Sequence, residues 1–255
     1  MKAVILAGGQ GTRLAEETAL KPKPLVEVGG MPVLWHIMKI YSHYGIHDFV
    51  ILCGYKGHMI KEYFSNYFLH KCDVQLDLKN NRIEVLKNGV EPWKISMIDT
   101  GVETMTGGRL KRVKDLVNGE TFCFTYGDGL SDVNVQNVID LHRQRKTIAT
   151  VTAMRHPNRF GILEVQGDSI SKFSEKPLVE SDWMNSGFFV LEPDIFDRIE
   201  DDSTVFEQKP LQMLVKDHQL TAYRHEGFFM GMDSLREKNV LEDLWTSGKA
   251  PWKVW

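Results

Sequence analysis

The chain has 255 residues, of which 31 are lysine or arginine and 34 are aspartate or glutamate, so its formal net charge is −3. This near balance argues against a general nucleic-acid binder, because such proteins carry an excess of positive charge. The length suits one large domain or two small ones, and a hydrophobic content of 42% is ordinary for a globular protein. No apolar run approaches the roughly 20 residues that a membrane span needs.

The three cysteines, Cys53, Cys72 and Cys123, are odd in number and far apart. Their spacing fits neither a disulfide framework nor a zinc site, so we expect reduced thiols. The apolar run Lys2–Ala7 is too short for the core of a signal peptide and leads directly into glycines. These features favour a protein of the cytoplasm.

The first 70 residues alternate between strand and helix patterns. Lys2–Ala7 and Phe49–Cys53 are short apolar runs that end at glycines, which is typical of buried strands. A helix is expected to begin at Pro32 and to end at Gly45, and a second one covers 59–68. The order β-loop-α-β-α predicts a parallel sheet with right-handed crossovers.

The pattern changes over residues 72–100. Three segments alternate between apolar and polar residues, namely Val74–Leu78, Arg82–Leu86 and Trp93–Ile98, and turn residues separate them. We expect an antiparallel excursion here, set into the mainly parallel pattern.

The α/β order resumes with a helix over 106–117 that is closed by Gly119, a strand at Thr121–Tyr126, a helix from Val135 and a strand at Ile148–Ala153. The remainder is mixed α+β. Its expected elements are a hairpin over 161–173, a strand at 188–191, a capping box from Thr204 to Glu207 ahead of a helix, a strand at 220–225, and a helix from near Asp233. A single domain over 1–255 with a mixed, mainly parallel sheet is the simplest interpretation.

The glycine loop that follows the first strand, Gly8-Gly-Gln-Gly-Thr-Arg13, is the first candidate site. Its glycines allow backbone N–H groups to converge, and Arg13 and Lys23 add positive charge, so a polyphosphate is the expected ligand. The spacing matches neither the dinucleotide fingerprint nor the Walker loop. A plain tight turn and an exposed, solvated Arg13 and Lys23 are the alternatives.

Two aspartates are candidates for a divalent cation. Asp128 lies between two glycines at a strand end, where a carboxylate can hold a metal and a ligand can approach closely. Asp233 is a second candidate. A turn role for Asp128 and an N-cap role for Asp233 are the alternatives.

Leu6-Ala-Gly-Gly-Gln-Gly-Thr-Arg-Leu14, followed by Lys21-Pro-Lys-Pro24, closely resembles the two-part signature of the sugar-1-phosphate nucleotidyltransferases. Further stretches follow in that family's order, at 127–128, 160–161, 175–177 and 185–189, so the resemblance covers essentially the whole chain. Within the family, the stretch Met105–Leu110 and the form Tyr126-Gly-Asp-Gly129 are most similar to the members that use CTP and glucose 1-phosphate.

The resemblance implies a Rossmann-like fold, with helices flanking the mixed, mainly parallel sheet. It also implies that a cytidylyl group passes from CTP to α-D-glucose 1-phosphate with release of pyrophosphate, assisted by Mg²⁺ and without a covalent enzyme intermediate. Residues 1–155 would mainly bind the nucleotide, and 156–255 the sugar phosphate. It also suggests a homo-oligomer and a place in the synthesis of CDP-linked dideoxyhexoses for surface polysaccharide (lipopolysaccharide O-antigen).

The resemblance also implies individual roles. Arg13, Lys23 and Asp128 would be catalytic, and Asp128 and Asp233 would bind Mg²⁺. Gly161, Glu175, Lys176 and Asn185 would bind the sugar phosphate. The nucleotide would be bound by Leu6, Ala7, Gly8, Gly9, Gln10, Gly11, Thr12, Arg13, Lys23, Thr104, Thr106, Gly108, Arg109 and Asp128.

Two departures from the family pattern bear on specificity. Members that use dTTP or UTP carry a different stretch where this chain has Met105–Arg109, which favours cytosine as the base, and Ser186 stands where glycine is usual. A uridylyl- or thymidylyltransferase is the main alternative. A catalytically silent nucleotide-sugar sensor is a further one, disfavoured because Arg13, Lys23 and both aspartates are present.

Overall fold

The computed structural model describes residues 1–87, 89–117, 119–155, 162–166, 169–174 and 183–255. The larger part of its central sheet is parallel, with β7 (Lys94–Asp99), β4 (Asp48–Cys53), β1 (Ala3–Ala7) and β8 (Phe122–Tyr126) side by side. Every residue of β1 is buried. A strand that is covered on both faces needs a continuous apolar run, as Lys2–Ala7 predicts.

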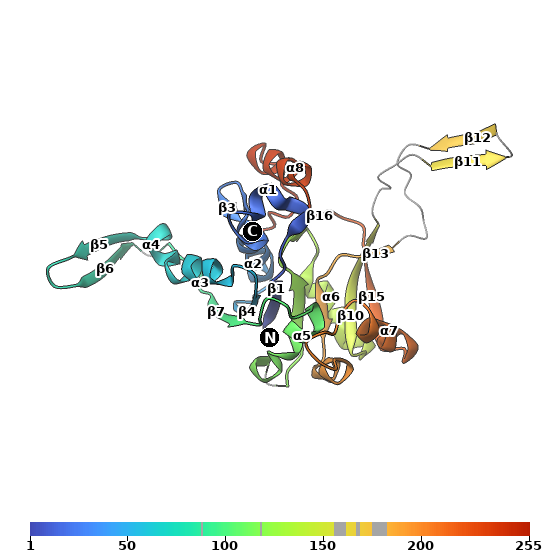
Figure 1. Ribbon diagram of the computed structural model, residues 1–255, viewed down its shortest axis with the longest axis horizontal. Helices are drawn as coiled ribbons and strands as arrows, with labels where there is room; N and C mark the ends of the chain where they lie inside the picture. The colour runs from blue at the N-terminus through green and yellow to red at the C-terminus, as the bar shows by residue number, and fades with distance from the viewer. Residues whose placement is uncertain (88, 118, 156–161, 167–168, 175–182) are drawn as a thin grey trace.

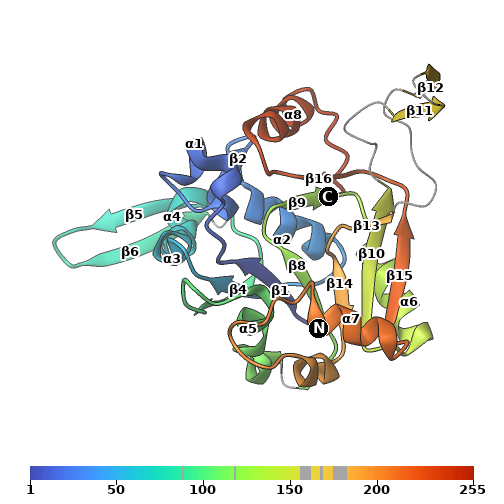
Figure 2. The ribbon, with the colours of Figure 1, turned by 45° about the vertical axis from the view of Figure 1, so that its right-hand side comes forward.

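The sheet continues beyond β8 with strands of mixed direction (Figure 2). β14 (Phe189–Leu191) is antiparallel to β8 and to β10 (Ala149–Arg155), β13 (Trp183–Asn185) is antiparallel to β10, and β15 (Leu220–His225) is parallel to β10. The expected fold class is therefore confirmed: a mixed, mainly parallel sheet in the first half and a mixed C-terminal half.

Helices cover both faces of the sheet and divide the core in two. One face packs on α2 (Val33–His43), α3 (Gly57–Ser65), α6 (Val135–Arg145) and α8 (Leu235–Thr246), and the other on α5 (Thr106–Lys111) and α7 (Lys209–Lys216). Along β1 the side chains alternate between the two cores, so that Ile5 belongs to the first and Val4 and Leu6 to the second.

Shorter elements complete the described part of the chain. These are η1 (Thr12–Leu14), α1 (Ala15–Thr18), η2 (Lys23–Leu25), β2 (Glu27–Val28), β3 (Met31–Pro32), α4 (Tyr67–Lys71), β5 (Asp73–Asp77), β6 (Arg82–Lys87), η3 (Lys114–Val117), β9 (Gly129–Ser131), β11 (Ile162–Gln166), β12 (Ser169–Ser174), η4 (Pro193–Arg198) and β16 (Phe229–Gly231). β11 and β12 form the expected hairpin. No helix among these residues is long and apolar enough to cross a membrane.

The expected excursion at 72–100 is antiparallel only in part. β5 and β6 form an antiparallel hairpin that projects away from the sheet (Figure 1). The third alternating segment, β7, instead pairs in parallel with β4 at the edge of the main sheet. Its residues are half-buried or exposed, so an edge strand of a parallel sheet shows the same alternation as a hairpin strand.

Three boundaries differ from the sequence prediction. The expected helix over 59–68 is two helices, α3 and α4, which meet at Asn66. The helix over 106–117 ends at Lys111 and is followed by the 3-10 turn η3. The capping box from Thr204 to Glu207 is wrong, because α7 begins at Lys209 without a side-chain cap.

Candidate active site

A pocket of about 740 Å³ opens where β1 and β8 end, and it is also lined by the segment that follows β7. In an open α/β sheet, ligands bind at the carboxyl ends of the strands. The lining residues are Leu6, Ala7, Gly8, Gly9, Gln10, Gly11, Thr12, Arg13, Lys23, Pro24, Val102, Glu103, Thr104, Met105, Thr106, Arg109, Tyr126, Gly127, Asp128, Asn185, Glu207 and Asp233.

The glycine loop forms one wall, and two of its glycines are there for a structural reason. A Cβ on Gly8 would lie 2.3 Å from Nη1 of Arg109, so only glycine lets the guanidinium pack beneath the loop. Gly11 has a φ of +65°, and a Cβ there would meet Thr18 at 2.8 Å. The loop is thus shaped by both backbone conformation and close packing.

Arg109 reaches from α5 into the end of the sheet, where it is 5% exposed. Its guanidinium donates hydrogen bonds to Oγ1 of Thr100 at 2.7 Å and to the carbonyl oxygens of Gly101 at 2.6 Å and Val102 at 2.9 Å. Burial lowers the pKa of Arg109, and the positive charge of Arg112 adds to this. Arg109 therefore holds the segment at 100–102 in place while it lines the pocket.

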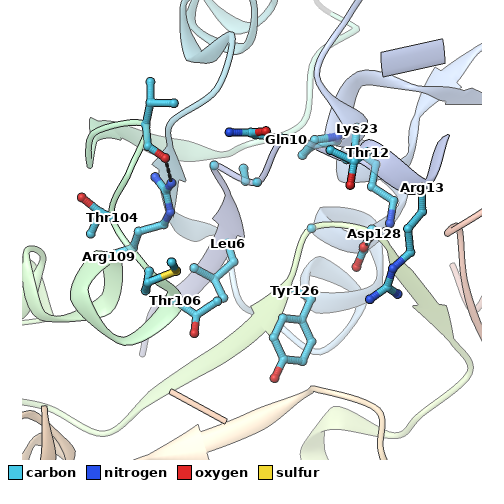
Figure 3. Close-up of a pocket in the computed structure, with 18 of the residues that line it drawn as sticks. Leu6, Gln10, Thr12, Arg13, Lys23, Thr104, Thr106, Arg109, Tyr126 and Asp128 are labelled. Carbon is cyan, nitrogen blue, oxygen red and sulfur yellow. Dashed lines mark hydrogen bonds and ion pairs between the residues drawn. The ribbon is translucent and has the colours of Figure 1, made fainter. Parts of the chain in front are cut away.

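Four charged side chains gather at the opposite end of the pocket. Lys23 Nζ donates to Oδ2 of Asp128 and to Oδ1 of Asp233, each at 2.6 Å, and Arg13 Nη1 lies 3.3 Å from Oδ2 of Asp233. Figure 3 shows Lys23, Arg13 and Asp128 together on one side and Thr104, Thr106 and Arg109 on the other. The pocket thus has one end rich in charged side chains and a second end formed by α5 and the segment before it.

The carboxylate of Asp233 is not the cap of α8. Ser234 occupies the N-cap position and accepts a hydrogen bond from the backbone N–H of Glu237 at 3.3 Å. Glu237 in turn accepts from the backbone N–H of Asp233 at 2.8 Å, one residue before the N–H that the Glu of a standard capping box binds. The side chain of Asp233 is therefore directed to Lys23 and Arg13 instead.

Asp128 and Asp233 fit a divalent cation. Both carboxylates converge on a single positive group, the ammonium of Lys23, so their oxygens lie close enough to share a cation. Within the described part of the chain, no group of three or more His, Cys, Asp or Glu side chains is arranged to hold a metal. Two carboxylates suit Mg²⁺, which commonly takes its remaining ligands from water and substrate phosphates.

A wall of hydrogen-bonded polar groups joins the two ends of the pocket. The hydroxyl of Tyr126 donates to Oε1 of Glu207 at 2.8 Å and accepts from the amide of Asn185 at 3.1 Å, and Thr106 donates to Oε2 of Glu207 at 2.6 Å. Burial and then Glu207 raise the pKa of Tyr126, which keeps the phenol neutral. Glu207 is a pocket residue that the sequence did not reveal, because its spacing from Thr204 resembles a helix cap.

The structure brings together most of the residues that the sequence analysis selects. All of the expected nucleotide-binding and metal-binding residues line the pocket except Gly108, and Asn185 lines it too. Gly108 is buried in α5, where a Cβ would lie 2.5 Å from Cα of Asp202. Gly161, Glu175 and Lys176 lie outside the described residues.

Comparison with known proteins agrees with this geometry. The model of the Nucleotidyl transferase family matches residues 2–245. Two glucose-1-phosphate cytidylyltransferases, from Salmonella typhi and Salmonella typhimurium, are each 54% identical over 256 residues, which is 100% of this chain and 100% of each relative. The fold is similar to a solved UDP-glucose pyrophosphorylase in complex with UDP-glucose, with a TM-score of 0.71 and 18% identity over 97% of this chain and 98% of that one. This chain is an enzyme of the Nucleotidyl transferase family.

Proposed function

We propose that the protein transfers the cytidylyl group of CTP to α-D-glucose 1-phosphate, giving CDP-glucose and pyrophosphate. The observation that carries this proposal is the full-length 54% identity to two glucose-1-phosphate cytidylyltransferases. The pocket supports it, because Arg13, Lys23 and two aspartates gather at one end and the segment expected to read the base lies at the other.

The reaction is a direct displacement. A phosphate oxygen of glucose 1-phosphate forms a bond to the α-phosphorus of CTP while the bond from that phosphorus to the bridging oxygen of the β-phosphate breaks, and pyrophosphate leaves. Among the described residues that line the pocket there is no Ser, Cys or His, so the usual strong nucleophiles are missing from this part of the wall. This supports a single step without a covalent enzyme intermediate.

The chain's own residues would bind and align the two substrates. Backbone N–H groups of the glycine loop and the side chains of Thr12 and Arg13 would hold the triphosphate, with Arg13 facing the pyrophosphate. Lys23 would contact the α-phosphate and the sugar phosphate. Asp128 and Asp233 would hold Mg²⁺, which supplies neutralisation of the phosphate charge when bound. Catalysis would rest on alignment and charge stabilisation.

Thr104, Thr106 and Arg109 line the second end of the pocket and would read the base. Asn185 is the one expected sugar-binding residue in the described pocket, and it lies beside Tyr126 on the connecting wall. The glucose would then lie between that wall and the charged end. We place the reaction in the cytoplasm, as the cysteine content favours, and its product would feed the synthesis of CDP-linked deoxysugars.

We further propose that the protein is a homo-oligomer. One face of the β5–β6 hairpin exposes large apolar side chains, with Leu76 55%, Ile83 53% and Val85 48% exposed. An apolar face of this kind is commonly covered by a partner. Light scattering should show an oligomer for the wild type and a lower mass for Leu76→Glu combined with Val85→Glu. A monomeric wild type would contradict the proposal.

The test of the proposed reaction is a nucleotide panel. The protein is incubated with glucose 1-phosphate, Mg²⁺ and CTP, UTP, dTTP or GTP separately, and pyrophosphate release and the sugar nucleotide are measured. CTP should give the highest kcat/KM. Activity with UTP or dTTP but not with CTP would support the uridylyl- or thymidylyltransferase alternative, and no activity with any nucleotide would support a sensor.

A further inference from the structure

Lys23 bridges the two aspartates that are expected to hold the metal. Its ammonium donates to both carboxylates at 2.6 Å, and its side chain is only 11% exposed. The lysine is therefore a cation located between two anions.

The groups around this contact are anchored by the backbone. Lys23 lies between Pro22 and Pro24 in η2, so its main chain is restricted. Asp128 is tied to the segment that carries Asp233 by the hydrogen bond from Met232 N–H to its carbonyl oxygen at 2.9 Å and by the β9–β16 pairing. The backbones that carry the two carboxylates are thus tied to each other, and the longest flexible part of the contact is the four-carbon stem of Lys23.

A divalent metal and the ammonium of Lys23 need the same carboxylate oxygens. Mg²⁺ ligands lie at about 2.1 Å from the ion, which leaves no room for an ammonium between the same two oxygens. Without the lysine, two carboxylates would face each other without this counter-ion, an arrangement that attracts cations. Metal entry therefore requires Lys23 to leave the pair.

We propose that Lys23 is an internal counter-ion of the free enzyme, which competes with the divalent metal for Asp128 and Asp233 until substrate phosphates draw it away. This inference rests on the proposed function in one respect, namely that the aspartates hold a metal. It predicts that the free enzyme binds the metal weakly, so that metal and nucleotide enter together rather than the metal remaining as a permanent component.

The test measures Mn²⁺ binding to the protein alone, at pH 8, from the electron paramagnetic resonance signal of free Mn²⁺. Lys23→Met should bind Mn²⁺ at least tenfold more tightly than the wild type, because the competing charge is gone. Lys23→Arg keeps the charge and should stay close to the wild type. Lys21→Met is the matched control, because Lys21 lies two residues from Lys23 but pairs with the exposed Glu27, and it should change the affinity less than twofold.

A second measurement keeps the proposal testable if Lys23→Met does not fold. The ε-carbon resonance of Lys23 in the wild type, assigned by comparison with Lys23→Arg, should shift when Mg²⁺ is added without nucleotide. Unchanged or weaker Mn²⁺ binding by folded Lys23→Met, or an unmoved Lys23 resonance at saturating Mg²⁺, would overturn the proposal. Neither measurement uses CTP or glucose 1-phosphate, so failure of the cytidylyltransferase assignment would be seen separately in the nucleotide panel.

Discussion

The hydroxyl of Tyr126 donates a 2.8 Å hydrogen bond to Glu207, 81 residues further along the chain. The second carboxylate oxygen of Glu207 accepts from Thr106 at 2.6 Å. A single carboxylate thus links the first residue of α5 to the end of β8. The side chain of Glu207 acts as a brace between the two ends of the pocket, because it fixes both hydroxyls.

Removal of this brace should impair the enzyme more than it destabilises the fold. Glu207→Ala leaves the hydroxyls of Tyr126 and Thr106 without an acceptor, which we expect to cost about 1–2 kcal/mol of unfolding free energy. We expect kcat/KM to fall at least tenfold, since both Thr106 and Tyr126 line the pocket. Steady-state kinetics and chemical denaturation measure the two effects. In a double-mutant cycle with Tyr126→Phe the losses should not add; independent losses would exclude the brace.

Arg109 should govern the choice of base more than the speed of the reaction. Arg109→Ala removes the donors that hold the carbonyl groups of Gly101 and Val102, so the adjoining Thr104 loses its fixed position. The ratio of kcat/KM for CTP over UTP should fall more than kcat does. Arg112→Ala is the control, because Arg112 pairs with the exposed Asp202 and should leave the ratio unchanged. An unaltered ratio in Arg109→Ala would remove Arg109 from base selection.

Substitutions at Asp233 and at its neighbour Ser234 should distinguish a role in catalysis from a role in helix capping. Asp233→Asn removes an expected metal ligand, and turnover should fall by orders of magnitude at any Mg²⁺ concentration. Asp128→Asn should act in the same way. Ser234→Ala should instead cost about 1 kcal/mol of unfolding free energy with turnover retained, since Ser234 caps α8. Turnover against Mg²⁺ concentration and thermal unfolding are the measurements, and a fully active Asp233→Asn would contradict the metal role.

His36 should make the fold sensitive to mild acid. Its Nε2 donates to the carbonyl oxygen of Val28 at 2.8 Å, it is fully buried, and Trp245 packs on its ring at 4.7 Å. Burial lowers the pKa of His36 to about 4. The unfolded chain, with a pKa of about 6.5, then binds more protons than the folded one between pH 6.5 and 4, so stability falls as pH falls through that window.

The loss attributable to His36 should reach about 3 kcal/mol near pH 4, since one pKa unit corresponds to about 1.4 kcal/mol. His36→Gln can keep the donor to Val28 but does not titrate. Urea denaturation at a series of pH values should therefore give a shallower decline for His36→Gln than for the wild type. Parallel declines would show that His36 does not contribute.

Much of this architecture could be predicted from the sequence because it depends on local patterns. The apolar run Ala3–Ala7 predicts a buried strand, and a glycine loop with Arg13 and Lys23 beside it indicates an anion site. β7 could not be assigned in the same way, because a half-exposed edge strand alternates like a hairpin strand. The alternation reports burial of one face, and it does not report the direction of the partner strand.

Glu207 shows a second limit of prediction from local sequence patterns. The pattern Thr204-x-x-Glu207 is a local signal for a cap, but the carboxylate of Glu207 bonds to Thr106 and Tyr126, which lie 101 and 81 residues away. Its role is decided by tertiary contacts that no local pattern contains. For Asp233, by contrast, the sequence left a metal ligand and a cap as alternatives, and the geometry of Ser234 assigns the cap.

The bridge made by Lys23 also bears on how the protein is made. Lys23 is separated by 105 residues from Asp128 and by 210 from Asp233. The charged end of the pocket therefore cannot assemble until nearly the whole chain has left the ribosome, and a nascent or truncated chain would hold an incomplete site. Such distant contacts slow folding, because the chain loses entropy before they form. An active enzyme therefore shows that synthesis has continued at least as far as Asp233.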